Sequence, residues 1–202
     1  MSEMDSPSET LLRQRLGAHL RASPTLMHVL QVVRSLALPD WRVASGAVYQ
    51  TVWNALTGRE PDYGIKDYDV MYFDPETSWD AEDAVIRRVA RAFDPALAAK
   101  VEVRNQARVH LWFEGKFGES YAPLAGTDES LTRFVSPAFA VGVRLEADGG
   151  LDVVAPFGLT DCFAMRLRPN PARGKPSAAL YARVSEGARA RWPEVGIEPL
   201  EP

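Results

Sequence analysis

The sequence has almost no cysteine and no long apolar run. Its one cysteine, Cys162, cannot form an intramolecular disulfide or a zinc site with other cysteines, which agrees with a reducing compartment. No stretch approaches the roughly 20 apolar residues that a membrane-spanning helix needs, and residues 1–7 lack the basic and apolar regions of a secretory signal. These absences predict a cytoplasmic protein with no membrane partner.

An excess of positive charge is also missing. The 202 residues include 27 acidic and 23 basic side chains, which give a formal net charge of -4. No large positive field therefore surrounds the protein, and extended binding of a long nucleic acid is not expected. A local basic pocket for one triphosphate needs only a few Lys or Arg residues and is compatible with this charge.

What the sequence does have is the composition of an ordinary globular protein, with 46% hydrophobic, 25% charged and 9% aromatic residues. The length is close to the roughly 100 to 200 residues usual for one domain, so we expect a single domain over 1–202. We expect 1–7 to be a flexible leader. The proline-rich segment 170–202, with one helix, is expected to wrap the domain.

Apolar periodicity and end signals predict a mixture of helices and strands. Leucines at helical spacing over 11–20 predict a first helix, and Ser23-Pro24 supplies the cap and first residue of a second. Residues 107–113 fit a strand and a helix equally well. The other expected elements are strands over 41–44, 67–73, 101–104, 139–146 and 151–154, and helices over 47–56, 81–93, 128–134 and 178–191.

Two short segments carry chemistry. Side chains alternate between the faces of a strand, so Asp67 and Asp69 point to the same side, and a divalent cation between them removes the cost of their repulsion. Mg²⁺ prefers such oxygen ligands together with substrate phosphates. Ser45-Gly46 lies where a strand gives way to a helix, whose first N–H groups favour a phosphate. Together these segments supply the two halves of an NTP site.

The same segments carry a family resemblance. Ser45–Val48, the helix end Leu56–Arg59 and Asp67–Asp69 resemble the DNA polymerase β-like nucleotidyltransferase superfamily, whose signature is a Gly-Ser or Gly-Gly turn followed by Asp-x-Asp. An ordered set of further segments resembles a little-characterised bacterial branch of that superfamily and covers most of the chain. These segments are Trp53, 66–74, 103–110, 155–161 and 168–171.

The resemblance implies an α+β nucleotidyltransferase fold, with a small mixed β-sheet flanked by helices. It also implies metal-dependent transfer of a nucleoside monophosphate from an NTP to an acceptor hydroxyl or amine, with release of pyrophosphate. Asp67 and Asp69 then hold two Mg²⁺ ions, or Mn²⁺ in their place, and a third carboxylate comes from a neighbouring strand. Glu102 is the candidate because it is out of phase with Val101 and Val103; the other interpretation is an exposed strand Glu.

Several residues are candidates for binding the nucleotide. Lys66 adjoins the acids and either meets a phosphate or only balances their charge. Arg104 and Arg108 offer guanidinium donors in the segment after the third strand. The complete set of nucleotide-binding candidates is Ser45, Gly46, Lys66, Arg104 and Arg108.

The sequence departs from the superfamily pattern in two places. The turn is Ser-Gly instead of Gly-Ser or Gly-Gly, and Tyr49-Gln50 stands where the tRNA-nucleotide-adding relatives carry Arg-Asp. A tRNA acceptor is therefore not expected. The residues do not specify the acceptor, the preferred NTP or the oligomeric state.

Two other interpretations stay open. Asp67–Val70 matches the opening motif of haloacid dehalogenase-type phosphohydrolases, but apolar strand residues precede the first Asp in that fold, and here 63–66 are mixed. The second is a catalytically weak or inactive nucleotidyltransferase fold that acts as a nucleotide-sensing or protein-interaction module. The acids favour metal binding, but ligation is not turnover and a fold does not decide function.

Overall fold

The computed structural model describes residues 8–173 and 178–200, so the predicted flexible leader 1–7 lies outside the described residues. Five strands form one sheet in the order β3-β2-β1-β4-β5. β2 and β3 run parallel, and the other neighbouring pairs run antiparallel. This confirms the predicted mixed sheet. The strands are β1 (Arg42–Ala44), β2 (Tyr68–Tyr72), β3 (Val101–Asn105), β4 (Gly142–Leu145) and β5 (Leu151–Val154).

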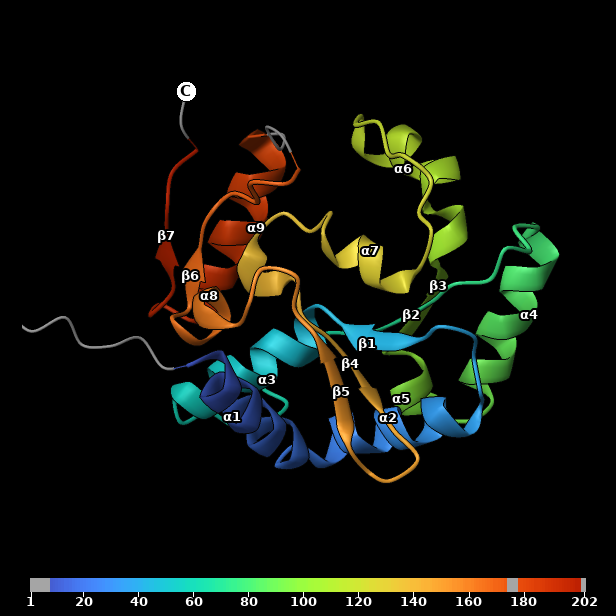
Figure 1. Cartoon of the computed structure of the whole chain (residues 1–202), viewed down its shortest axis with the longest axis horizontal. Coiled ribbons are helices and arrows are strands. Elements are labelled where there is room, and N and C mark those ends of the chain that lie inside the picture. The colour runs from blue at the N-terminus through green and yellow to red at the C-terminus, as the bar shows by residue number, and fades with distance from the viewer. Residues whose placement is uncertain (1–7, 174–177, 201–202) are drawn as a thin grey trace, which may run out of the picture.

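The first two helices lie together on one side of this sheet, as Figure 1 shows. They are α1 (Glu9–Arg21) and α2 (Pro24–Ser35), and the hydroxyl of Ser23 accepts a hydrogen bond from the backbone N–H of Leu26 at 3.3 Å. This cap and both helices were predicted from the sequence and are confirmed. The apolar side of α2 is fully buried against the sheet, which places the main core between α1, α2 and one sheet face.

Helices α6, α7 and α9 lie on the opposite side of the sheet (Figure 1). The segment 107–113, which the sequence left open, belongs to a 3-10 turn, Gln106–Arg108, and then to α6. Asp94, directly after the predicted helix 81–93, caps a further short helix through its carboxylate. The helices after α2 are α3 (Gly46–Leu56), α4 (Trp79–Ala90), α5 (Pro95–Ala98), α6 (Val109–Phe117), α7 (Thr127–Leu131), α8 (Thr160–Phe163) and α9 (Ala178–Arg191).

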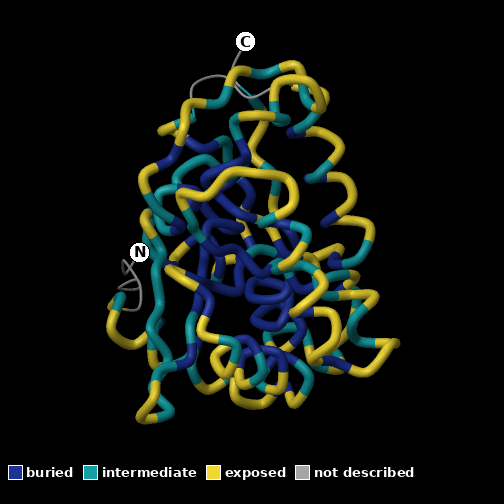
Figure 2. Tube along the Cα trace, turned by 90° about the vertical axis from the view of Figure 1, so that its right-hand side faces the viewer, coloured by how far each residue is buried: buried dark blue, intermediate teal, exposed yellow. Residues whose placement is uncertain are grey.

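The register of the strands divides the sheet into two chemically different faces. On the first, which we call the apolar face, Val43, Val70, Val103 and Val143 are buried in the core shared with α2. Figure 2 shows this buried part of the chain at the centre of the molecule. The second, the charged face, carries the residues between them. These are Arg42, Ala44, Asp69, Met71, Glu102, Arg104, Gly142, Arg144, Asp152 and Val154.

One helix is attached to the charged face by an ion-pair network. Arg42 is buried and pairs with Asp128 of α7 and with Asp152 of β5, the latter at 2.9 Å. Arg144 of β4 also pairs with Asp152, at 3.2 Å. Leu131 of α7 packs on Ala44 and Met71 within a second, small core. α7 therefore covers the β1–β4–β5 part of the charged face together with Met71 of β2, and leaves Asp69 and the β3 residues to the cavity described below.

The C-terminal segment packs on earlier elements through buried polar contacts. Two short strands, β6 (Arg166–Leu167) and β7 (Gly196–Ile197), pair in parallel. The indole N–H of Trp192 donates to the Oδ1 of Asn54 in α3 at 2.9 Å, and the Tyr181 hydroxyl donates to the carbonyl of Leu167 at 3.1 Å. Within the described ranges, no helix has the length and apolar character that crossing a membrane requires.

Candidate active site

Three carboxylates meet on the charged face, beside the parallel strand pair. Asp67 immediately precedes β2, Asp69 lies in β2, and Glu102 of β3 is the direct neighbour of Asp69 in the parallel register. Asp67 and Asp69 are half-buried and Glu102 is exposed. Strand alternation thus brings Asp67 and Asp69 to one side, as predicted, and sheet pairing adds the carboxylate of Glu102 to them.

Burial and neighbouring carboxylates raise the pKa values of both Asp67 and Asp69. Burial, then the neighbouring charges of Asp67 and Glu102, raise the pKa of Asp69 to about 7. Burial and the Glu102 charge also raise the pKa of Asp67, while Lys66 and Arg191 act in the opposite direction. The site is therefore a place where negative charge is crowded and a bound cation is stabilising. Among the described residues, however, no three His, Cys, Asp or Glu side chains already form a metal-ion cage.

The turn between β1 and α3 has a backbone conformation that ordinary residues rarely adopt. Ser45 has φ 60° and ψ -133°, in a region that favours glycine, and no side chain caps the start of α3. The Ser45 hydroxyl also interacts with the Asp69 carboxylate and lowers its pKa. Such strained conformations persist where the surrounding structure imposes them and cluster at functional sites.

Gly46 allows the start of α3 to lie close to the acids. A Cβ atom at Gly46 would stand 2.8 Å from the Nε2 of Gln50 and 3.9 Å from the Oδ1 of Asp67. The uncapped helix start therefore adjoins the carboxylate of Asp67. Backbone N–H groups and the positive end of the α3 dipole lie beside a group of acids, an arrangement that suits a phosphate bridged to the acids by a cation.

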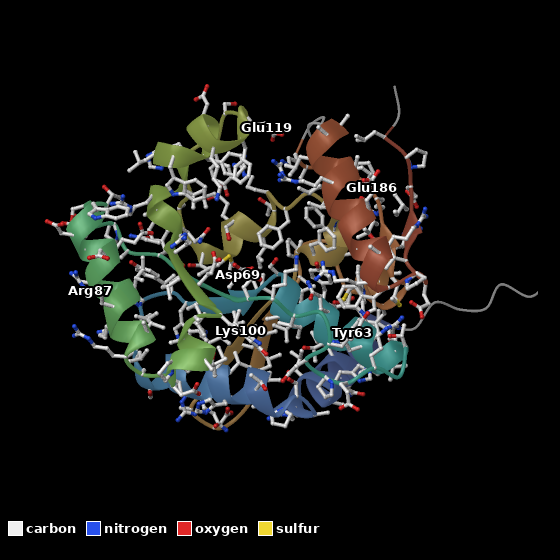
Figure 3. The ribbon with its side chains drawn as sticks, turned by 180° about the vertical axis from the view of Figure 1, so that it is seen from behind. Tyr63, Asp69, Arg87, Lys100, Glu119 and Glu186 are labelled. Carbon is white, nitrogen blue, oxygen red and sulfur yellow. The ribbon has the colours of Figure 1, made fainter. Side chains whose placement is uncertain are left out.

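A cavity of about 540 Å³ opens above this part of the sheet. Ser45, Asp69 and Glu102 lie at its base, and α6 and α9 contribute its walls. Figure 3 shows the labelled Asp69 between these two helices. Seven aromatic side chains and five arginines line the cavity. The arginines are Arg104, Arg133, Arg173, Arg183 and Arg191.

The structure brings most, but not all, of the predicted nucleotide-binding residues together. Ser45 and Arg104 line the cavity with Asp69 and Glu102, and Gly46 adjoins Asp67. Arg104 is half-exposed and stands 3.9 Å from the Glu102 carboxylate. Lys66 is exposed and acts on the charge of Asp67 without lining the cavity.

Arg108 does not join this group. Its guanidinium is buried, pairs with Glu82 of α4 at 2.9 Å and donates to the carbonyl of Thr77. The reason is that β3 ends at Asn105 and the chain turns at Gln106. Arg108 therefore does not continue the charged face beyond Arg104. The structure gives it the role of joining α4 to the end of β3, in place of the predicted contact with nucleotide.

α9 contributes residues to the site that were not predicted from the sequence. The guanidinium of Arg191 donates to the carbonyl of Gly64 at 2.7 Å. Burial raises the pKa values of Asp67 and Tyr49, and the charge of Arg191 opposes that rise, so Arg191 lies near the acids. Arg183, Gly187 and Arg191 follow each other at intervals of four residues and line the cavity from one side of the helix. That spacing was a readable signal, but nothing in the sequence says which sheet face the helix covers.

Comparisons with known proteins agree with this geometry. A family model described as nucleotidyltransferase matches residues 31–197. A solved NMR structure, described as revealing a CCA-adding enzyme head domain, has 23% sequence identity and a TM-score of 0.75, with 98% of each chain covered. At this identity the match shows the fold. No curated protein matches the chain.

Proposed function

Because the chain belongs to the nucleotidyltransferase family, we propose that it transfers a nucleoside monophosphate from an NTP to an acceptor hydroxyl or amine and releases pyrophosphate, in a metal-dependent reaction. The observation that carries the proposal is the meeting of Asp67, Asp69 and Glu102 beside the uncapped start of α3. This arrangement supplies acids for a cation and N–H donors for a phosphate at one end of a cavity.

The donor set fits Mg²⁺, with Mn²⁺ as a substitute. Mg²⁺ is bound in phosphoryl-transfer sites by one or two carboxylates together with substrate phosphates, so the nucleotide itself completes the coordination. Asp67 and Asp69 would hold the two expected ions, and Glu102 would be the third carboxylate beside them. When bound, the ions neutralise phosphate charge and increase the acidity of an acceptor hydroxyl.

The residues of the chain have separate tasks in this proposal. The first N–H groups of α3, at Gly46 and Ala47, face the phosphate chain, and the Ser45 backbone holds them in place. Arg104, which acts on the charge of Asp69, and Arg191, which acts on the charge of Asp67, both line the cavity and reduce the charge of the bound triphosphate. The cavity walls keep the acceptor close to the reacting phosphorus and orient it for attack, which increases the rate of transfer.

The acceptor we favour is a small molecule and not tRNA. The Tyr49 side chain is buried and packs on Trp53 and Phe139, with ring centroids 4.7 Å and 4.5 Å away. Gln50 is also buried, and its Nε2 is 3.0 Å from the Tyr49 hydroxyl. These two positions therefore serve internal packing here, and the net charge of -4 offers no attraction to a long polynucleotide.

Titration calorimetry with the four NTPs and Mg²⁺ tests the proposal on the native protein and on the Asp67→Asn/Asp69→Asn variant. We expect Mg²⁺-dependent NTP binding that the double variant loses. Asp80→Asn is the matched control, since Asp80 is exposed on α4 and does not line the cavity. Absence of NTP binding by folded native protein would contradict the nucleotide site.

Transfer itself is tested separately, with α-labelled NTP and a panel of hydroxyl and amine acceptors. Label that moves to an acceptor, with equimolar pyrophosphate, is the expected result. Tight Mg²⁺–NTP binding without transfer to any acceptor would instead favour a nucleotide-sensing module that uses the same residues for binding alone.

A further inference from the structure

Four aromatic side chains are concentrated in a segment of ten residues and form one wall of the cavity. They are Trp112, Phe113 and Phe117 of α6 and Tyr121 of the following loop. The Phe113 ring centroid lies 4.7 Å from that of Phe117 and 4.5 Å from that of Tyr121. We call this group the aromatic wall.

The aromatic wall is not part of the packing that holds the fold together. In the described ranges, neither of the two hydrophobic cores includes any of its members, and each member is only half-buried. Half-exposed aromatic rings in contact with one another keep a large apolar surface in water, which is unfavourable unless a ligand covers it. Their place in the cavity thus indicates a ligand-binding role.

Arginine side chains lie over the faces of two of these rings. The guanidinium of Arg173 is 5.8 Å from the Phe113 ring centroid and pairs with Glu119 at 2.6 Å. The guanidinium of Arg133 is 5.9 Å from the Tyr121 ring centroid. Aromatic rings and guanidinium planes are the groups on which proteins stack nucleobases.

The aromatic wall and the acids share one cavity but lie in different parts of it. Glu102 and Asp69 lie on the sheet, whereas α6 rises away from the end of β3. Figure 3 shows the labelled Glu119, just past the end of α6, at the end of that helix that lies away from Asp69. A ligand that occupies both parts therefore carries its phosphates at one end and a planar group at the other.

We propose that the aromatic wall is the nucleobase subsite, which binds the base of the NTP by stacking and distinguishes poorly among the four bases. The inference rests on the proposed function and adds to it an expected preference among the NTPs. Two polar side chains that line the cavity are already engaged: the Nε2 of Gln106 donates to the Arg104 carbonyl at 3.3 Å, and the Ser130 hydroxyl donates to the Thr127 carbonyl at 2.6 Å. Stacking uses the π-face that every base has, and purines offer the larger face.

The test compares triphosphates with and without a base. Calorimetry measures the binding of Mg²⁺ complexes of ATP, GTP, CTP, UTP and inorganic tripolyphosphate to native protein, Phe113→Leu and Leu111→Ala. Phe113→Leu keeps an apolar side chain and removes the ring. Leu111→Ala is the control, because Leu111 is 59% exposed on the same helix and does not line the cavity.

In native protein we expect all four NTPs to bind within roughly tenfold of one another, with the purines tighter. Phe113→Leu is expected to weaken NTP binding by roughly fivefold to a hundredfold and to leave tripolyphosphate binding unchanged. Leu111→Ala should change neither the affinity for NTPs nor the affinity for tripolyphosphate. A second readout is quenching of Trp112 fluorescence by ATP but not by tripolyphosphate, which Trp112→Phe should abolish while ATP still binds.

Two results would overturn the inference and leave the phosphate site intact. One is tripolyphosphate binding as tight as ATP binding, and the other is NTP affinity that Phe113→Leu does not change. Failure of the proposed function has a different signature, because then neither the NTPs nor tripolyphosphate bind in the presence of Mg²⁺.

Discussion

The two faces of the five-stranded sheet are made by the same strands and have opposite chemistry. On the apolar face Val43, Val70 and Val143 are at most 1% exposed, because α2 covers them. On the charged face Asp69, Glu102 and Arg104 remain open to a cavity. Alternating residues of a three- to five-residue strand thus serve stability on one side and binding on the other.

The buried apolar face stabilises the fold, and this explains why the protein can hold crowded carboxylates on the charged face. Burial of the apolar face contributes roughly 25 cal/mol per Å² of surface removed from water. The crowded carboxylates act against that gain, since the ionised form of Asp69 is disfavoured by burial and by Asp67 and Glu102. The comparison predicts that changes on the apolar face lower stability without altering binding, and that changes at the carboxylates abolish binding without lowering stability.

The largest stability effect is expected on the α2 side of the apolar face. Leu30→Ala removes a fully buried side chain from the main core and should lower the free energy of unfolding by about 2 to 5 kcal/mol. Urea unfolding measures this loss. Mg²⁺–NTP affinity should stay unchanged at a temperature where the variant is folded, and a large loss of affinity would mean that the two faces are not independent.

A smaller effect is expected from Arg42→Met, which breaks the ion-pair network on the charged face. Arg42 is buried, but its partners Asp128 and Asp152 are 47% and 39% exposed, so water can solvate them once the guanidinium is gone. We expect a loss of roughly 1 to 2 kcal/mol in unfolding free energy. If Arg42→Met unfolds at the same temperature as native protein, the network does not attach α7 to the sheet. Arg13→Met, which replaces a half-exposed arginine, is the control.

The smallest effect is a pH dependence of stability, and it tests the charged face at Asp69. The pKa of Asp69 is raised from 3.8 to about 7 in the folded protein, so the folded state binds more protons than the unfolded state between these values. In metal-free protein this group's stability contribution is therefore present below about pH 4 and is lost as the pH rises to about 7.

Asp69→Asn removes that dependence. At pH 8 the variant should be more stable than native protein by on the order of 1 to 2 kcal/mol, and the difference should shrink toward pH 4. Unfolding curves of the two proteins at matched pH, without metal, give the difference directly. A constant difference across this range would show that Asp69 is not held in an unfavourable ionised state.

The sequence predicted the elements with strong local signals and missed those determined by distant contacts. The cap at Ser23 and the leucine spacing define α1 and α2, and 178–191 was predicted with the bounds of α9. The run 107–113 fits two periodicities, and only the surrounding structure makes it part of α6. Short elements such as α8 and β6 carry too few residues for a pattern.

The same distinction applies to the site. The shared side of Asp67 and Asp69 was predicted from alternation along one strand, a local rule. Glu102 was predicted because the family resemblance implies a third carboxylate and alternation selects this residue for it. The pairing of Asp69 with Glu102 required the register of β2 and β3. Arg191 contacts Gly64, which is more than a hundred residues away in the sequence. Arg108 pairs with Glu82 because the chain leaves β3 and forms a 3-10 turn before it. Neither contact could be predicted from the residues next to these arginines.

The contact between Arg191 and Gly64 has a consequence for the order in which the protein is made. The ribosome completes the strands that carry the three acids long before it adds α9. A nascent chain that has emerged as far as β5 has the segments that hold its acids, but its cavity still lacks the arginine-bearing wall. Until α9 has been added, the acids therefore lie on an open surface, and they face an enclosed pocket only after α9 has packed beside them.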